Sequence, residues 1–175
     1  SQMKIKSKAK EFLFVDGYNI INSWEDLKKL SLVSLEDARE ALLEIMAEYQ
    51  HYSGIEIHVV FDAHMVRGNN GTEEDHKGVR VVYTKENELA DHYIEKVLDQ
   101  IGRIKRVRVA TSDWVEQQIV LSRGGTRISA RELEVEIINE RNMVNRRRKK
   151  TNLRNDMQLG KIEDQLLEKL KDWNK

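Results

Sequence analysis

Four aspartates stand at positions where folding could gather them into one site. Three of them follow short apolar runs, at residues 12–15, 55–61 and 107–110, and these are Asp16, Asp62 and Asp113. The fourth, Asp91, lies near the start of an amphipathic segment, beside Glu88. Carboxylates held together repel one another, and a divalent cation is the usual compensation. Because the chain has no cysteine, oxygen ligands for Mg²⁺ or Mn²⁺ are favoured over a zinc site.

A site of this kind is suited to phosphodiester hydrolysis. An ion held by a few carboxylates keeps several waters, and it can activate one of them while it binds phosphate oxygens. Asn19, three residues after Asp16, and Ser112, directly before Asp113, could position that water. Each residue taken alone could equally be a helix cap or a turn residue. Three aspartates at successive strand ends favour the shared metal site.

Apolar runs alternate with helical periods along the chain. The runs predict strands at 12–15, 55–61, 79–83, 107–110 and 126–128. Apolar residues at helical spacing predict helices near 24–30, 34–49, 88–101, 115–120 and from 129 onward. The polar stretch 63–78 predicts a loop. This order is typical of an α/β fold with a mostly parallel sheet of about five strands, in which ligands bind at the carboxyl ends of the strands.

The basic residues are concentrated in one window. Lysine plus arginine and aspartate plus glutamate both number 30, yet residues 141–154 hold seven cations and no acid. The window predicts contacts with the phosphates of a nucleic acid, and a solvated helix face is the alternative. The candidate binding residues there are Arg146, Arg147, Arg148, Lys149 and Lys150. Arg67, in the predicted loop, and Arg123 are further candidates for clamping a phosphate.

Composition excludes several other classes of protein. Without cysteine there are no disulfides, thiolate metal sites or cysteine nucleophiles. No apolar run is long enough for a membrane span, and the basic start lacks the apolar stretch of a signal peptide. We therefore expect a cytoplasmic protein. The histidines lack ligand spacing, and Trp114 is expected to pack in the core rather than to stack on a base.

Four motifs, in order along the chain, resemble the NYN domain, which belongs to the PIN-like group of nucleases. They are Phe12–Ile21, Val60–Ala63, Glu88–Asp91 and Thr111–Trp114. Together with Arg127–Leu133 they are most similar to the YacP-like branch of bacterial endoribonucleases. The similarity covers most of the chain. Leu89 departs from the pattern, since a small polar residue is expected there, and this puts a hydroxyl contact at that position in doubt.

The resemblance implies a PIN-like three-layer α/β/α fold with a C-terminal helical extension. It also implies Mg²⁺- or Mn²⁺-dependent cleavage of RNA and, for the YacP-like branch, cleavage of mRNA in association with the ribosome. Asp16, Asp91 and Asp113 match the acidic metal-site positions, with Asn19 beside them. Asp62 matches the strand-end aspartate of the family, and its contact with the metal stays open.

Three alternatives were weighed. A haloacid-dehalogenase phosphatase needs a second aspartate two residues after the first, where this chain has Tyr18. A receiver domain needs an aspartate after the third strand and a lysine after the fifth, where Thr84 and Ser129 stand. The serious alternative is a non-catalytic RNA- or ribosome-binding module on the same fold. The retained acids argue against it, because a negative pocket without metal weakens the binding of a polyanion.

The chain divides into three predicted parts. Residues 1–10 form a flexible N-terminus, 11–140 the nuclease-like domain, and 141–175 the basic segment and a C-terminal helix. An apolar stripe in that helix, from Ile162 to Trp173, could pack on the domain or pair with a second copy. We expect packing on the domain and a monomer.

Overall fold

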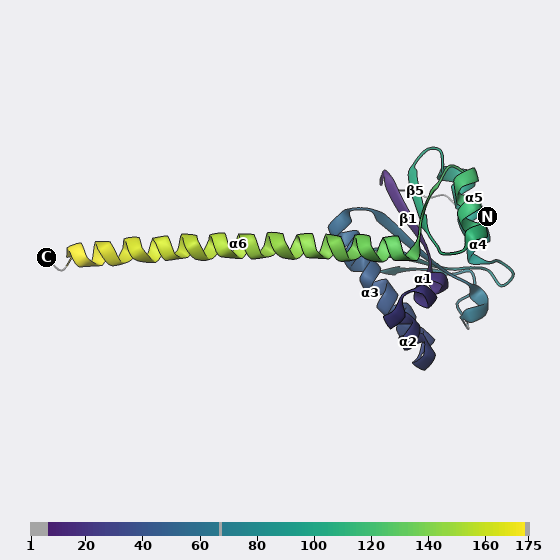
Figure 1. Cartoon of the computed structure of the whole chain (residues 1–175), viewed down its shortest axis with the longest axis horizontal. Helices are drawn as coiled ribbons and strands as arrows, with labels where there is room; N and C mark the ends of the chain where they lie inside the picture. The colour runs from purple at the N-terminus through teal and green to yellow at the C-terminus, as the bar shows by residue number, and fades with distance from the viewer. Residues whose placement is uncertain (1–6, 67, 174–175) are drawn as a thin grey trace. The chain divides into compact units, whose positions relative to one another are not determined.

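The computed structural model describes residues 7–66 and 68–173 (Figure 1). The elements in chain order are β1 (Glu11–Asp16), α1 (Gly17–Ser23), α2 (Glu25–Val33), α3 (Leu35–Ser53), β2 (Glu56–Phe61), a 3₁₀ turn (Ala63–Met65), β3 (Glu73–His76), β4 (Val79–Tyr83), α4 (Ala90–Ile101), β5 (Arg106–Ala110), α5 (Trp114–Ser122), β6 (Thr126–Ile128) and α6 (Ala130–Trp173). None of the helices in these ranges is long and apolar enough to cross a bilayer.

The sheet has six strands in the order β3-β4-β2-β1-β5-β6. Every pair is parallel except β3 with β4. The prediction of a mostly parallel α/β sheet is therefore confirmed, and the five predicted strands are all present. Because parallel strands run the same way, the residues that follow β1, β2 and β5 lie at one edge, and these include Asp16, Asp62 and Asp113.

β3 is a strand that the sequence analysis did not predict, and it corrects the prediction of a loop over 63–78. β3 is polar and exposed along most of its length, so it carries no apolar signal. It exists because it pairs on one side with β4 through a two-residue turn at Lys77 and Gly78. Both turn residues have positive φ, as tight hairpins require, and the Gly78 N–H donates to Asp75 Oδ1 at 3.1 Å.

Alternating side chains of the central strands bury both faces of the sheet. Leu13 and Val15 pack with α1, α2, α3 and the start of α6, whereas Phe12 and Phe14 pack with α4 and α5. The three layers position the strand ends rigidly. Helix ends are capped as the sequence predicts: the Asp37 N–H donates to Ser34 Oγ, and Gly54 ends α3 at φ 73°.

α1 begins directly after Asp16, where the sequence analysis predicts no helix. Gly17, its first residue, packs so closely on Phe61 of β2 that a Cβ atom would collide with the phenyl ring. Glycine is therefore required by space at this position, not by an unusual backbone angle. The contact brings the ends of β1 and β2 together, and with them Asp16 and Asp62.

The chain separates into two units, residues 1–137 and 138–175. The predicted flexible N-terminus, 1–10, falls largely outside the described residues. α6 is one continuous helix of 44 residues, so the basic segment and the C-terminal helix form a single element. In the second unit, the apolar side chains of Ile162, Leu166 and Leu170 are about half exposed.

Candidate metal centre at the carboxyl edge of the sheet

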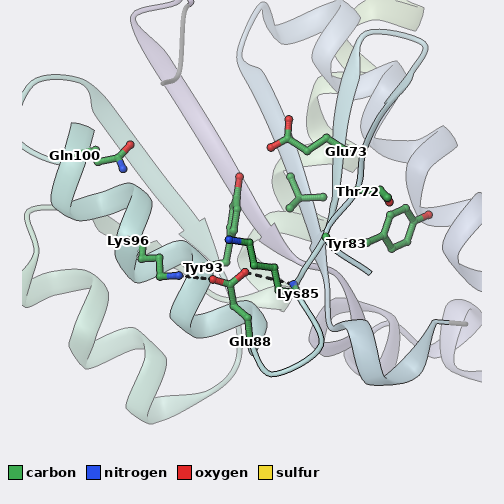
Figure 2. A pocket seen from close by; sticks show the side chains of 10 residues that line it. Thr72, Glu73, Tyr83, Lys85, Glu88, Tyr93, Lys96 and Gln100 are labelled. Atoms are coloured by element: carbon green, nitrogen blue, oxygen red, sulfur yellow. Dashed lines mark hydrogen bonds and ion pairs between the residues drawn. The ribbon is translucent and has the colours of Figure 1, made fainter. Parts of the chain in front are cut away.

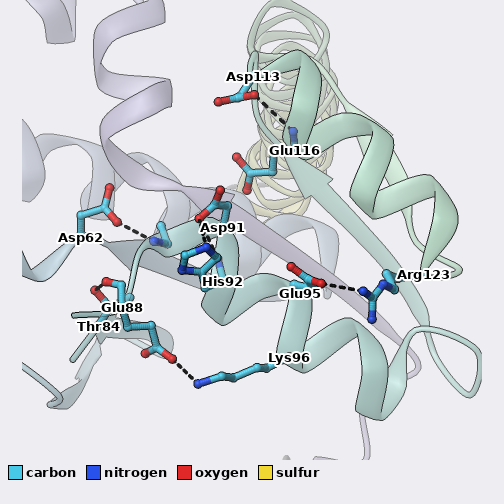
Figure 3. Close-up of polar contacts among 11 residues, drawn as sticks. Asp62, Thr84, Glu88, Asp91, His92, Glu95, Lys96, Asp113, Glu116 and Arg123 are labelled. Atoms are coloured by element: carbon cyan, nitrogen blue, oxygen red, sulfur yellow. Dashed lines mark hydrogen bonds and ion pairs between the residues drawn. The ribbon is translucent and has the colours of Figure 1, made fainter. Parts of the chain in front are cut away.

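Four carboxylates meet at this edge of the sheet. Asp16 ends β1, Asp62 follows β2, Asp91 lies in the first turn of α4, and Glu116 lies in the first turn of α5. The negative charges of Asp62 and Asp91 both act on Asp16, and that of Asp91 also acts on Glu116. We call these four residues the sheet-edge cluster. Asp62, Asp91 and Glu116 appear in Figure 3, where they come from three separate segments.

Asp16 and Glu116 form the buried centre of this cluster. Glu116 is only 3% exposed. Its Oε2 accepts a hydrogen bond from Thr111 Oγ1 at 2.9 Å, and its buried Oε1 accepts none from the described residues. The two carboxyls face each other, and protonated Glu116 donates a hydrogen bond to Asp16. Burial raises the pKa of both carboxyls, and the charge of Asp16 raises that of Glu116 further.

The main causes of these two pKa shifts are burial and neighbouring carboxyls, and none of them is a lysine or arginine. The imidazole of His92 lies beside the cluster, with Nε2 4.0 Å from Asp91 Oδ1. The negative charge is thus left for a ligand to neutralise. An all-oxygen donor set with an unused buried oxygen fits a hard divalent cation such as Mg²⁺ or Mn²⁺.

Backbone donors fix the two outer acids of the cluster. Asp62 Oδ1 accepts from the N–H of Ala90, the first residue of α4, at 2.5 Å, and so holds that helix against β2. Asp91 Oδ1 accepts from the N–H of His92 at 2.8 Å. Each carboxylate keeps its second oxygen for a ligand. These bonds orient both side chains before any ion arrives.

Asp113, predicted as a metal ligand, caps α5. Its Oδ1 accepts from the N–H groups of Val115 at 2.9 Å and Glu116 at 3.2 Å. The side chain is exposed, and it is not among the main causes of the pKa shifts of Asp16 and Glu116. A contact between Asp113 and a metal, direct or through water, stays a prediction.

Glu116 was missed by the sequence analysis. Its signal is the spacing Asp113-x-x-Glu116, in which the first acid caps a helix and the second lies three residues later in its first turn. That spacing resembles an ordinary helix start, in which the second acid stays in solvent. The structure instead buries Glu116 against Thr111 and turns it toward Asp16.

Asn19 of α1 binds the segment between β5 and α5. Its Oδ1 accepts from the Ser112 N–H at 2.6 Å, and Ser112 Oγ lies 3.4 Å from Ser23 Oγ. The amide therefore ties α1 to the segment between β5 and α5. Water positioning by Asn19 and Ser112 remains a prediction, for which the Asn19 amide nitrogen and the exposed Ser112 hydroxyl are the groups at hand.

The arginines and lysines predicted to contact phosphates belong to different elements of the chain. Arg67 lies outside the described residues. Arg123 donates to Asp99 at 2.5 Å and to Glu95 at 2.6 Å, so its guanidinium joins α5 to α4 (Figure 3). The five basic candidates of the window are exposed on α6, in the second unit, and these are Arg146, Arg147, Arg148, Lys149 and Lys150.

The expectation that Trp114 packs in the core is wrong. The side chain is 69% exposed at the start of α5, so it does not pack in the core. Val115 beside it is 64% exposed. An indole in this position, next to Asp113, is free to stack on a base.

Comparison with known proteins identifies the family. A model of the YacP-like NYN domain matches residues 13–175. The chain belongs to this family. It is 44% identical to the uncharacterized protein YacP of Bacillus subtilis over 170 residues, which cover 94% of this chain and 97% of that protein. The resemblance carried by the four sequence motifs is thereby confirmed.

Two solved structures share the fold of this YacP-like NYN domain. The crystal structure of Rae1 (YacP) from Bacillus subtilis is 39% identical, with a TM-score of 0.71 and 94% of each chain covered. A mutant of Rae1 is 43% identical, with a TM-score of 0.70, and 81% of this chain and 84% of that chain are covered. The α/β architecture and the C-terminal helix agree with these structures.

A second acidic group of this NYN domain lies elsewhere. Glu40, Glu44 and His76 offer ligand atoms that all lie within 4.8 Å of one another, close enough to hold a metal ion. We call these three residues the surface cluster. Glu44 already accepts hydrogen bonds from His76 at 2.9 Å and Lys77 at 2.8 Å, and these bonds lower the pKa of Glu44. The sequence analysis gave no hint of this group, because its members come from α3 and the edge strand β3.

Proposed function

We propose that this YacP-like NYN domain is an endoribonuclease that hydrolyses RNA phosphodiester bonds with Mg²⁺ or Mn²⁺ at the sheet-edge cluster. One observation carries the proposal: four carboxylates converge at the carboxyl edge of the sheet, and Glu116, which is buried, has an oxygen that accepts no hydrogen bond from the described residues. Such an arrangement costs stability unless a cation binds. Its occurrence in a chain of the YacP-like NYN family supports a metal-dependent active site.

The residues divide the work between them. Asp16 and Glu116 hold the divalent cation, and Asp62, Asp91 and Asp113 bind it directly or through water. When bound, the cation supplies a Lewis acid for the scissile phosphate and lowers the pKa of a water. Asn19 and Ser112 orient that water through the amide nitrogen and the hydroxyl. A carboxylate of the cluster would accept the proton of that water.

We further propose that the RNA is single-stranded mRNA bound at the ribosome, in the cytoplasm. The exposed basic residues of α6 support contact with an RNA backbone, and the exposed indole of Trp114 supports stacking on an unpaired base. Both features fit a strand whose bases are accessible.

Incubation of the purified full chain with mRNA, alone and on translating ribosomes, tests the proposal. Cleavage should appear with Mn²⁺ or Mg²⁺ and disappear with EDTA. RNA binding without metal-dependent cleavage in either setting would favour the alternative, a non-catalytic RNA- or ribosome-binding module. Retained binding of RNA by a cleavage-deficient Asp16→Asn variant would separate the two activities.

A further inference from the structure

A pocket lies between α4 and the β3–β4 hairpin (Figure 2). Its volume is about 180 Å³, and the residues that matter to its chemistry are Thr72, Val82, Lys85, Glu88, Tyr93 and Gln100. None of these residues belongs to the sheet-edge cluster or to the basic window. The pocket is therefore a separate feature of the surface.

Tyr93 contributes a phenol hydroxyl to the pocket that is not bonded to the rest of the described chain. The residue is 6% exposed, and its hydroxyl forms no hydrogen bond with any residue of 7–66 or 68–173. In Figure 2 the ring stands inside the pocket beside the Lys85 side chain. Burial raises the pKa of the phenol, so it stays protonated at neutral pH and can donate a hydrogen bond. A hydroxyl that lines a pocket and makes no hydrogen bond to the protein is available to a ligand as a donor and as an acceptor.

The charges around the pocket limit what that ligand can be. Glu88 pairs with Lys96 at 2.6 Å, and Glu73 pairs with Arg80 at 2.6 Å, so both carboxylates are neutralised. Lys85 forms no ion pair within the described part of the chain, and it is the one cation of the pocket left to bind a ligand. A ligand with a single negative charge fits this balance, while a triphosphate would meet the two glutamates.

The remaining walls favour a flat polar group. Val82 and the ring of Tyr93 offer apolar surface, and the Tyr93 hydroxyl and the Gln100 amide offer both donors and acceptors. One phosphate and one planar heterocycle with polar edges make up a nucleotide. The lining therefore fits one nucleotide unit better than it fits a peptide or a metal ion.

The pocket and the sheet-edge cluster share one turn. Thr84 Oγ1 accepts from the Ala63 N–H at 2.9 Å and donates to the Glu88 carbonyl oxygen at 2.7 Å. Ala63 follows Asp62, and Glu88 lines the pocket. A strand that crosses the cluster can thus place a neighbouring nucleotide beside Lys85.

We propose that this pocket binds one nucleotide of the RNA strand next to the bond that is cut, with Lys85 on the phosphate and Tyr93 and Gln100 on the base. The inference rests on the proposed function for the identity of the strand. Nucleotide recognition itself is independent of cleavage, and it can be measured in the presence of EDTA.

Titration of the full chain with adenosine and uridine 5′-monophosphate, followed by amide NMR shifts in EDTA, tests the pocket. We expect saturable shifts at Gly71, Thr72, Lys85 and Gln100. Tyr93→Phe, which keeps the ring, and Lys85→Ala, on the surface, should each weaken binding about three- to tenfold. Lys29→Ala, a matched lysine change on α2, should leave binding unchanged. Absence of saturable shifts at these amides, or unchanged binding by both pocket variants, would overturn the proposal.

Binding of a short single-stranded RNA to the same proteins, again in EDTA, separates the strand from a free nucleotide. Weaker RNA binding by Tyr93→Phe and Lys85→Ala supports the proposal. Weaker mononucleotide binding with unchanged RNA binding assigns the pocket to a free nucleotide and overturns the strand assignment. Cleavage is assayed apart in Mn²⁺, so loss of the proposed function and loss of the pocket would be seen in different measurements.

Discussion

The sheet-edge cluster and the surface cluster are both groups of acids, and they differ in what balances their charge. In the surface cluster, Glu44 is about half exposed and is bonded to His76 and Lys77. In the sheet-edge cluster, Glu116 is buried, and its neighbours Asp16 and Asp91 are negative. Ligand atoms close to one another therefore do not by themselves mark a metal centre. Buried carboxyls with raised pKa values, held next to further acids, are the stronger indication.

The largest expected effect concerns catalysis. Asp16→Asn should lower metal-dependent RNA cleavage by about a thousandfold or more, because a ligand worth several kcal/mol in the transition state is lost. Glu44→Gln, a matched amide change in the surface cluster, should cleave at the parental rate. Initial rates on a labelled RNA in Mn²⁺ measure both. A reversed pattern, with Glu44→Gln inactive, would move the active site to the surface cluster.

Metal binding should separate the clusters next. At Mn²⁺ concentrations near 100 times the dissociation constant, the parent chain gains about 2.7 kcal/mol of stability. Thermal unfolding with and without Mn²⁺ should show this gain in the parent and in Glu44→Gln, and lose most of it in Asp16→Asn. Equal gains in all three proteins would mean that the stabilising ion binds at neither Asp16 nor Glu44.

The two clusters should also respond oppositely to pH. The pKa of Glu116 is raised in the folded state, so the metal-free protein becomes less stable as pH rises from the ordinary carboxyl range toward that raised value. Glu116→Gln removes this loss and should stabilise the metal-free chain by about 1 to 2 kcal/mol at pH 8. Urea unfolding at pH 5 and pH 8 in EDTA measures the difference. A Glu116→Gln protein less stable than the parent at pH 8 would contradict the buried charge.

Glu44 gives the smallest effect, with the opposite sign. Hydrogen bonds from Lys77 and His76 lower the pKa of Glu44, so its contribution is present above the ordinary carboxyl pKa and fades as pH falls through the lowered value. Because the group is exposed, Glu44→Gln should shift the melting temperature only slightly. A large destabilisation near neutral pH would show that the surface cluster has a structural role that its exposure does not suggest.

Much of the fold was predictable from the sequence. The central strands are buried on both faces, so they appear as continuous apolar runs, as in β1 and β2. β3 was not predicted because its residues are polar and mostly exposed. Its strand conformation depends on pairing with β4, which the local sequence does not reveal. α1 was not predicted because Asp16-Gly17 has the composition of a turn, and the helix starts there only because Gly17 can pack against Phe61.

The site was predictable in its location and less so in its membership. Asp16, Asp62 and Asp91 converge because parallel strands end at one edge, which the order of elements already implies. The sequence alone could not show which of Asp113 and Glu116 belongs to the buried cluster. Which acid caps α5 and which turns inward depends on the Thr111 hydroxyl and on burial, and both arise only in the folded chain. Trp114 was wrongly expected in the core because aromatic side chains are usually buried there.

Gly17 controls the site although it carries no functional group. Its missing side chain is the gap that the Phe61 ring fills, and the residues on either side of this contact are Asp16 and Asp62. Any larger residue at 17 would force the ends of two strands apart and widen the spacing between two carboxylates. An apolar contact thus sets the spacing between the Asp16 and Asp62 carboxylates. Gly17→Ala, which adds one methyl group, would disturb that spacing while every acidic residue stays in the sequence.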